Sequence, residues 1–293
     1  MPTDYFSDRE NGPRPRTGET INQVVWNGIA ALVQSLVADG SFGASFPDVC
    51  ADGSDVVGTN ANAWRSVLMT EHPGIEWPFR TDEVPSTLAI LDLLEFTHGH
   101  IAKPIQGSYQ GFFRHHHLSY DLEAGRTEFA QRVNRLFARN GLAYELGGDG
   151  KVLRLAPAVL RETLQTTTFQ TGDGTLDAML ESARVKFVNP DSKVRREALE
   201  KLWDAWERIK TIESGNDKKA QVKTLLDKAA AEPNFRALVE TEAVALTSVG
   251  NNFLIRHSET NRTQIGDDAH VDYLFHRLFS LIAMLLRTRA AST

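Results

Sequence analysis

The chain has a single cysteine, Cys50, so it cannot form an internal disulfide. Such sparing use of cysteine fits a reducing cytoplasm. The sequence also lacks a run of eighteen apolar residues, and residues 1–16 are polar and contain prolines instead of the apolar stretch of a signal peptide. We therefore expect a cytoplasmic protein without a membrane partner.

An excess of positive charge is missing as well. The formal net charge is −6, with 38 acidic and 32 basic residues, so no global field draws the protein onto nucleic acid. An RNA partner would have to bind a local patch of basic residues. The hydrophobic share of 41% and the charged share of 24% are ordinary for a globular protein. A length of 293 residues suggests two domains.

Several signature motifs are absent. The sequence has no P-loop lysine, no Gly-x-Gly-x-x-Gly turn, no nucleophile elbow and no His-Glu-x-x-His. Nucleotide hydrolysis, hydride transfer and zinc proteolysis therefore have no sequence support, and we expect no cofactor.

Apolar residues at helical spacing dominate the first half of the chain. They predict helices over residues 21–40, 62–71, 85–103 and 126–140. We place these helices in an N-terminal α+β domain, residues 1–170, with a sensing or regulatory role.

The clearest strand signal is a predicted hairpin. Residues 142–146 and 151–155 flank the glycine-rich turn 147–150. A helix followed by such a hairpin is winged-helix-like, and Lys151 and Arg154 could then touch nucleic acid. The alternative is a hairpin that packs on its own helix.

From residue 171 the pattern is wholly helical, and we expect an all-α bundle over residues 171–293. Helices are predicted over residues 190–210 and 234–257 and from His270 onward. The predicted fold class is therefore mainly α, with a small β-hairpin in the N-terminal domain.

Polar groups gather where the last two predicted helices meet. His270, Tyr273 and Arg277 lie along one edge of the final helix, beside its apolar face. Arg256 and His257 fall at the end of the preceding helix, where the helix dipole favours a cation.

This part of the chain resembles the C-terminal helical module of abortive-infection proteins related to the HEPN superfamily. The resemblance is carried by Ile255-Arg256-His257-Ser258-Glu259 and by His270-Val271-Asp272-Tyr273-Leu274-Phe275. In active HEPN members, an Arg, a polar residue and a His four to six positions later form an RNA-cleaving site across a dimer. The resemblance implies Arg256 as that Arg and a homodimer through the C-terminal helices.

The N-terminal half resembles the N-terminal domain of AbiJ-type abortive-infection proteins. This resemblance is carried by the block 128–155, by Tyr5-Phe6-Ser7 and by the region of Trp26. Together the two resemblances imply an antiphage protein, with a phage component or a toxin–antitoxin protein as a further partner.

The HEPN-like pattern departs from the family at its histidine. No His stands four to six residues after Arg256. Either His257 or His270 serves as the catalytic His, or the site is degenerate and the domain only binds RNA or protein.

The chemistry of the active alternative needs no metal. A neutral imidazole can take the proton of an RNA 2′-hydroxyl, and a guanidinium can neutralise the charge that builds on the phosphorane. The candidate catalytic residues are Arg256, His257 and His270, and the candidate substrate-binding residues are Glu259, Arg262, Tyr273 and Arg277. A purely structural alternative is that Arg256 closes the helix end by pairing with Glu259.

The run His115-His116-His117 is a possible metal motif. In an extended segment His115 and His117 face the same way. No cysteine or carboxylate lies at a ligand spacing, the nearest acid being Asp121. The sequence alone therefore predicts no metal site here.

Overall fold

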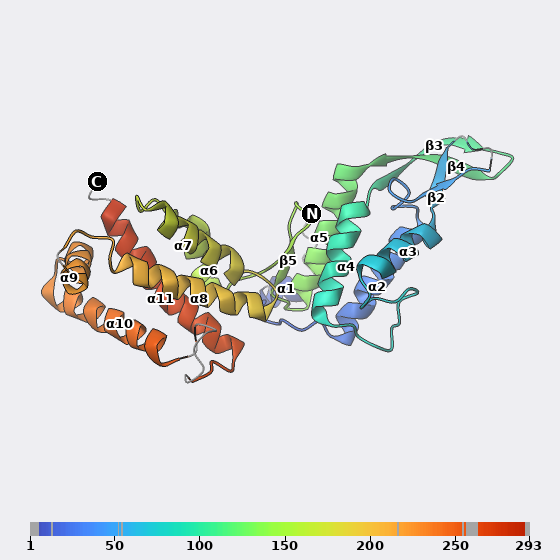
Figure 1. Ribbon diagram of the computed structural model, residues 1–293. Helices are drawn as coiled ribbons and strands as arrows, with labels where there is room; N and C mark the ends of the chain where they lie inside the picture. The colour runs from blue at the N-terminus through green and yellow to red at the C-terminus, as the bar shows by residue number, and fades with distance from the viewer. Residues whose placement is uncertain are drawn as a thin grey trace. The chain divides into compact units, whose positions relative to one another are not determined.

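The computed structural model describes residues 6–12, 14–51, 53, 55–215, 217–253, 255 and 263–290. The chain divides into two compact units, Met1–Leu155 and Ala156–Thr293 (Figure 1). The first unit combines helices with small antiparallel sheets, and the described part of the second is built from helices. This confirms the predicted fold class. The expected domain boundary after residue 170 stays a prediction.

The described part of the first unit contains the four predicted helices, the last of which begins at Leu122 instead of residue 126, and a short helix over Phe6–Asn11 that was not predicted. They are α1 (Phe6–Asn11), α2 (Gln23–Ala38), α3 (Ala61–Glu71), α4 (Thr87–His100) and α5 (Leu122–Arg139). The side chains of Asn22, Asn60, Ser86 and Asp121 each accept a hydrogen bond from a backbone N–H in the first turn of the helix that follows. Such capping satisfies donors that a helix cannot satisfy itself and fixes where these four helices begin.

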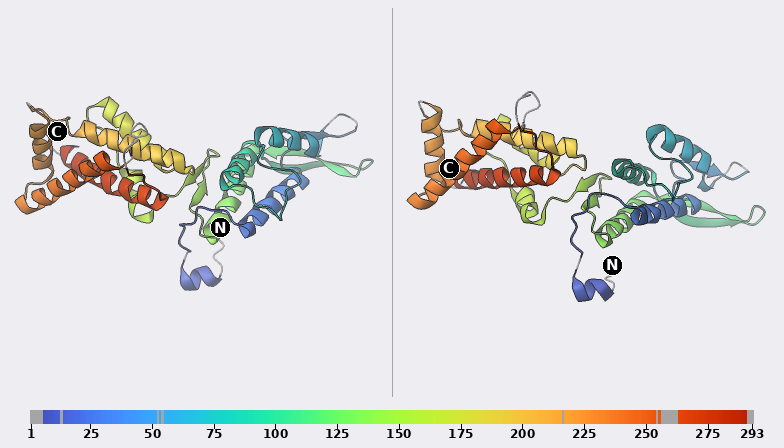
Figure 2. Two further views of the ribbon diagram at one scale, coloured as in Figure 1. Left: turned by 60° about the horizontal axis from the view of Figure 1, so that its bottom comes forward. Right: turned by 90° about the horizontal axis from the view of Figure 1, so that it is seen from below.

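Three two-stranded antiparallel sheets lie in the described part of this unit. They pair β1 (Pro47–Val49) with β2 (Val56–Thr59), β3 (Lys103–Gln110) with β4 (His115–Asp121), and β5 (Tyr144–Leu146) with β6 (Val152–Arg154). The predicted hairpin is β5–β6. The other two sheets were not predicted, because their residues are mostly exposed or half-buried and lack the alternation of apolar and polar residues that marks a strand. Figure 2 shows the β3–β4 ribbon from two further directions.

The β5–β6 hairpin packs against its own helix. The Asn134 side chain on α5 hydrogen-bonds both the N–H and the carbonyl of Leu146, at 2.8 and 2.9 Å. Lys151 Nζ lies 2.8 Å from a carboxylate oxygen of Glu95, and Arg154 is buried and lies 2.7 Å from Glu19. Both predicted nucleic-acid contacts are therefore engaged with carboxylates inside the domain, which agrees with the alternative that the hairpin packs on its helix.

The second unit is a bundle around α11. Its helices are α6 (Ala158–Thr166), α7 (Gly174–Phe187), α8 (Ser192–Ile209), α9 (Lys218–Ala229), α10 (Pro233–Asn252) and α11 (Asp268–Ala290). Phe275 of α11 is buried and stacks on Phe187 of α7, with ring centroids 3.8 Å apart. Trp203 and Trp206 of α8 are buried in the same core. The apolar stripe predicted for the last helix is thus the centre of the bundle.

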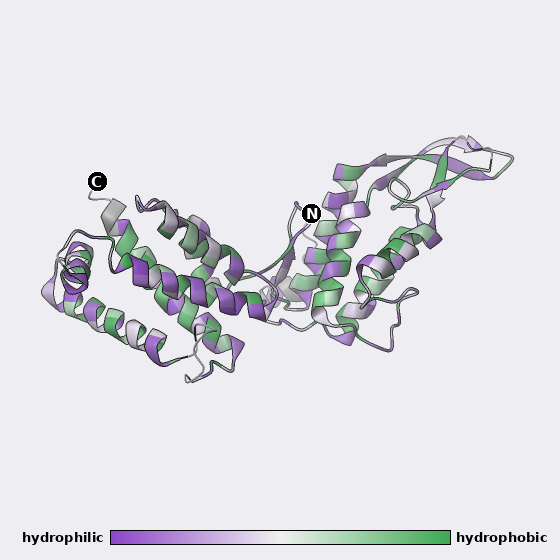
Figure 3. Cartoon of the chain, viewed as in Figure 1, coloured by the Kyte–Doolittle hydropathy of each residue, from purple (hydrophilic) through white to green (hydrophobic). Residues whose placement is uncertain are grey.

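Helix α11 is apolar enough, by length and composition alone, to cross a membrane, and among the described helices it alone meets that test. Half of the apolar stretch, Asp268–Arg287, is buried inside the unit. The core helix of a globular bundle has the same composition. Figure 3 shows apolar and polar residues interleaved along the helices of both units, as expected where each helix buries one face.

Candidate functional site

The connection between α10 and α11 is anchored at both ends. Phe253 and Thr263 form an isolated parallel bridge, and the Thr263 N–H donates to the Asn252 carbonyl at 3.3 Å. Ile255 and Ile265 are both buried in the core of the bundle. The described residues on either side of the segment 256–262 therefore lie at the same end of the helix pair.

Four of the predicted site residues lie outside the described part of the chain. They are Arg256, His257, Glu259 and Arg262. Their roles in catalysis and RNA binding stay predictions.

His270 occupies the first turn of α11 and its side chain is exposed. Its backbone N–H donates to the Asp267 carbonyl at 3.1 Å, which fixes the start of the helix. An exposed imidazole is open to a substrate, as a general base must be.

Tyr273 and Arg277 are brought together one turn apart. The Arg277 guanidinium lies over the Tyr273 ring, 5.8 Å from its centroid. Arg277 also donates two hydrogen bonds to Glu242 of α10, at 2.8 and 2.9 Å. Hydrogen bonding to that carboxylate raises the pKa of Arg277 above its ordinary value. The charge of Arg277 is thus already matched within the bundle.

His270 does not share this cluster. It lies two turns before Arg277, about 10 Å away along the helix axis. The final helix thus carries an exposed imidazole at its start and the pair of Arg277 with Glu242 further along.

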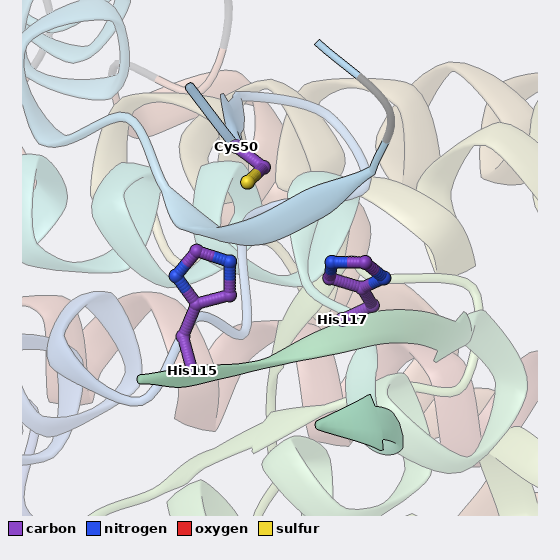
Figure 4. A group of neighbouring side chains, drawn as sticks. All are labelled: Cys50, His115 and His117. Atoms are coloured by element: carbon purple, nitrogen blue, oxygen red, sulfur yellow. The ribbon is translucent and has the colours of Figure 1, made fainter. Parts of the chain in front are cut away.

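A second group of reactive side chains lies in the first unit. His115 and His117 of β4 face Cys50, which follows β1 (Figure 4). Candidate ligand atoms of the three residues all lie within 4.8 Å of one another. The predicted absence of a ligand near the histidines rested on sequence spacing, and the fold supplies Cys50 from a distant segment. No local pattern signals this, because only tertiary packing places β2 beside β4.

Comparison with known families identifies the family to which the N-terminal part of the chain belongs. Residues 4–170 match AbiJ N-terminal domain 4, which is more than half of the 293 residues. The chain belongs to this AbiJ family. The predicted AbiJ resemblance is thereby confirmed, and the chain is related to abortive infection. The match includes Cys50, His115 and His117 but ends before α7, so the HEPN-like module stays a prediction. No match was found among curated proteins or among solved structures.

Proposed function

We propose that this AbiJ-family chain acts in antiphage abortive infection and that its helical unit is a HEPN-like, metal-independent ribonuclease. The observation that carries the proposal is the end of the α10–α11 pair. There the exposed His270 follows a segment, residues 256–262, whose flanking residues Ile255 and Ile265 are held in the core. Arg256 and His257 come directly after the first of these anchors.

The reaction is an attack of the RNA on itself. The imidazole of His257 or His270 accepts the proton of a 2′-hydroxyl, and the oxygen attacks the adjacent phosphorus. The bond to the 5′-oxygen breaks, and that oxygen takes up a proton from solvent water as it leaves. The products carry a 2′,3′-cyclic phosphate and a 5′-hydroxyl. Arg256 neutralises the charge on the phosphorane oxygens.

One observation favours a second candidate, a non-catalytic RNA-binding or assembly protein. Arg277 already has a carboxylate partner in Glu242, so its guanidinium is less available to a phosphate. The missing Arg-to-His spacing points the same way. In this case the fold and the dimer surface persist without cleavage.

A homodimer through the C-terminal helices forms part of the proposal. Phe235 and Leu238, three residues apart on one side of α10, are large apolar side chains with exposed fractions of 46 and 62%. Their burial against a second copy would remove apolar surface from water. We further propose a cytoplasmic protein that is triggered by a phage component or a toxin–antitoxin partner.

The test is incubation of the purified full chain with total RNA and with tRNA in the presence of EDTA. We expect cleavage that leaves 2′,3′-cyclic phosphate ends. The variants Arg256→Ala, His257→Ala and His270→Ala are compared, and His276→Ala serves as a control from the same helix as His270. Loss of Arg256 should slow cleavage by at least about 100-fold.

The outcomes separate the two candidates. Equal cleavage by the wild type and all three variants would exclude this site. Binding of RNA without cleavage would favour the non-catalytic alternative. Growth arrest on overexpression should likewise depend on Arg256.

A further inference from the structure

We propose that Cys50, His115 and His117 bind one zinc ion, which joins the turn between β1 and β2 to the β3–β4 ribbon. The three side chains come from two segments far apart in the sequence, and their candidate ligand atoms lie within 4.8 Å of one another (Figure 4). This site lies in the AbiJ domain and is independent of the ribonuclease proposal.

The pleat of β4 selects the two histidines. Successive side chains of a strand point to opposite faces, so His115 and His117 share one face and His116 takes the other. The neighbours of His116 agree with this. Its Nδ1 lies 3.1 Å from the Gly107 carbonyl oxygen, and its ring packs on Tyr109, 5.0 Å between centroids. His116 is therefore a natural internal control.

A tight turn fixes the cysteine. The Cys50 N–H donates to the Asp55 carbonyl and the Gly53 N–H donates to the Cys50 carbonyl, both at 2.8 Å. Gly53 has a positive φ of 77°, which a glycine adopts without strain. Cys50 is only 4% exposed, so its thiol faces the protein interior and the histidines rather than solvent.

Asp55 orients the second histidine. Its Oδ2 lies 2.9 Å from Nδ1 of His117, and the Ser108 hydroxyl lies 3.4 Å from the same nitrogen. With the proton on Nδ1 and donated to Asp55, the lone pair of His117 is on Nε2. Histidine ligands of metals usually donate their other ring N–H to a carboxylate in this way.

The nitrogen atoms left for a metal are buried and unsatisfied. Nε2 of His115 and Nε2 of His117 are both shielded from solvent, and neither has a hydrogen-bond partner among the described residues. A buried polar atom without a partner typically costs about 1–3 kcal/mol. A bound cation would satisfy both nitrogens at once.

The donor set favours zinc. One thiolate and two imidazoles are ligands of Zn²⁺, which binds sulfur at about 2.3 Å and nitrogen at about 2.0–2.1 Å. Tetrahedral binding at these lengths puts ligand atoms about 3.5 Å apart. On binding, the metal would draw the ligand atoms, which lie within 4.8 Å of one another, to this separation. A water molecule would take the fourth position, and Asp55 would hold the ring of His117 without binding the metal itself.

The metal would stabilise an element that has little core of its own. Most residues of β3 are exposed, and a two-stranded ribbon is marginal by itself in water. Joining β4 to the turn that follows β1 constrains both. We expect the zinc-loaded domain to melt at a higher temperature than the metal-free domain.

The experiment uses the full chain, purified without a polyhistidine tag. We expect about one zinc per chain by elemental analysis. Replacement of zinc by Co²⁺ should give a thiolate-to-cobalt charge-transfer band, which reports the sulfur ligand directly. Cys50→Ala should lose the band, and His115→Ala and His117→Ala should bind cobalt at least about 100-fold more weakly. Asp55→Asn should weaken binding by about 10–100-fold. His116→Ala should behave as the wild type.

Two results would overturn the proposal. One is a wild-type chain that takes up neither zinc nor cobalt at micromolar concentration. The other is equal cobalt binding by the wild type and Cys50→Ala. Circular dichroism in excess chelator shows whether each variant is folded. If a variant does not fold, the cobalt band of the wild type still tests the proposal. Metal content is read without RNA, so failure here and failure of the ribonuclease proposal are distinguishable.

Discussion

Glu242 of α10 accepts two hydrogen bonds from the guanidinium of Arg277 on α11, at 2.8 and 2.9 Å. This forked geometry is the strongest form of ion pair between side chains. It connects the two helices whose ends flank the candidate ribonuclease site. Arg277 therefore has a structural reason to be present, apart from any contact with RNA.

We expect Arg277→Ala to lower the free energy of unfolding by about 1–2 kcal/mol, because a charge-assisted, half-buried pair is lost. Urea denaturation measures this. Glu242→Ala should cost a similar amount, and the double variant should cost less than the sum. RNA cleavage should persist in Arg277→Ala. A variant of normal stability that no longer cleaves would instead place Arg277 on the substrate.

A second ion pair holds the start of α11. The guanidinium of Arg195 on α8 is buried and lies 3.3 Å from Asp268, and it donates to the Pro190 carbonyl at 2.7 Å. Arg195→Met should destabilise the bundle by about 1–3 kcal/mol, because the half-buried carbonyl groups of Asn189 and Pro190 and the half-exposed carboxylate of Asp268 lose their charged donor. The neighbouring Arg196 lies 3.9 Å from Asp268 and is half-buried, so Arg196→Met should cost less than about 1 kcal/mol. Thermal unfolding of the two variants measures these losses of stability. Equal losses would refute the conclusion that Arg195, and not Arg196, holds the start of α11.

Two helical glycines should respond to alanine with opposite signs. A Cβ on Gly125 of α5 would lie 2.4–2.6 Å from backbone atoms of Ala102 and Lys103, and backbone cannot rotate away. Gly125→Ala should therefore cost about 2–3 kcal/mol or more. Gly99 of α4 has no atom within 4 Å of the added Cβ, so Gly99→Ala should stabilise by about 0.5–1 kcal/mol. Differential scanning calorimetry measures the change in melting temperature of each variant. Destabilisation by Gly99→Ala would contradict this account.

The first unit should lose stability in mild acid. The pKa of His98 is lowered below its ordinary value of 6.5. Burial is the larger cause, and the nearby Arg126 cation is the smaller one. The unfolded chain then binds a proton that the folded chain does not, so stability is complete above pH 6.5 and falls as the pH drops from there toward the lowered pKa. His98→Asn should make the melting temperature less sensitive to pH over this window. The same slope in the wild type and the variant would exclude His98 as the source.

The sequence by itself determined the features whose signals are local. Apolar residues at helical spacing place α2 and most of α5, and the glycine-rich turn places the β5–β6 hairpin. The contact between Tyr273 and Arg277 also follows from helical spacing, since residues four apart share a face. A few neighbouring residues suffice to specify each of these.

The tertiary structure alone decided which distant groups meet. The pairing of Arg277 with Glu242 needs α10 and α11 to lie within reach of each other's long side chains, and the approach of Cys50 to His115 and His117 needs β2 beside β4. The β3–β4 ribbon escaped prediction because its exposed strands carry no alternating pattern. Contacts between remote segments depend on how whole helices and strands pack. That packing is determined by residues throughout the core, not by the residues next to either side chain of the contact.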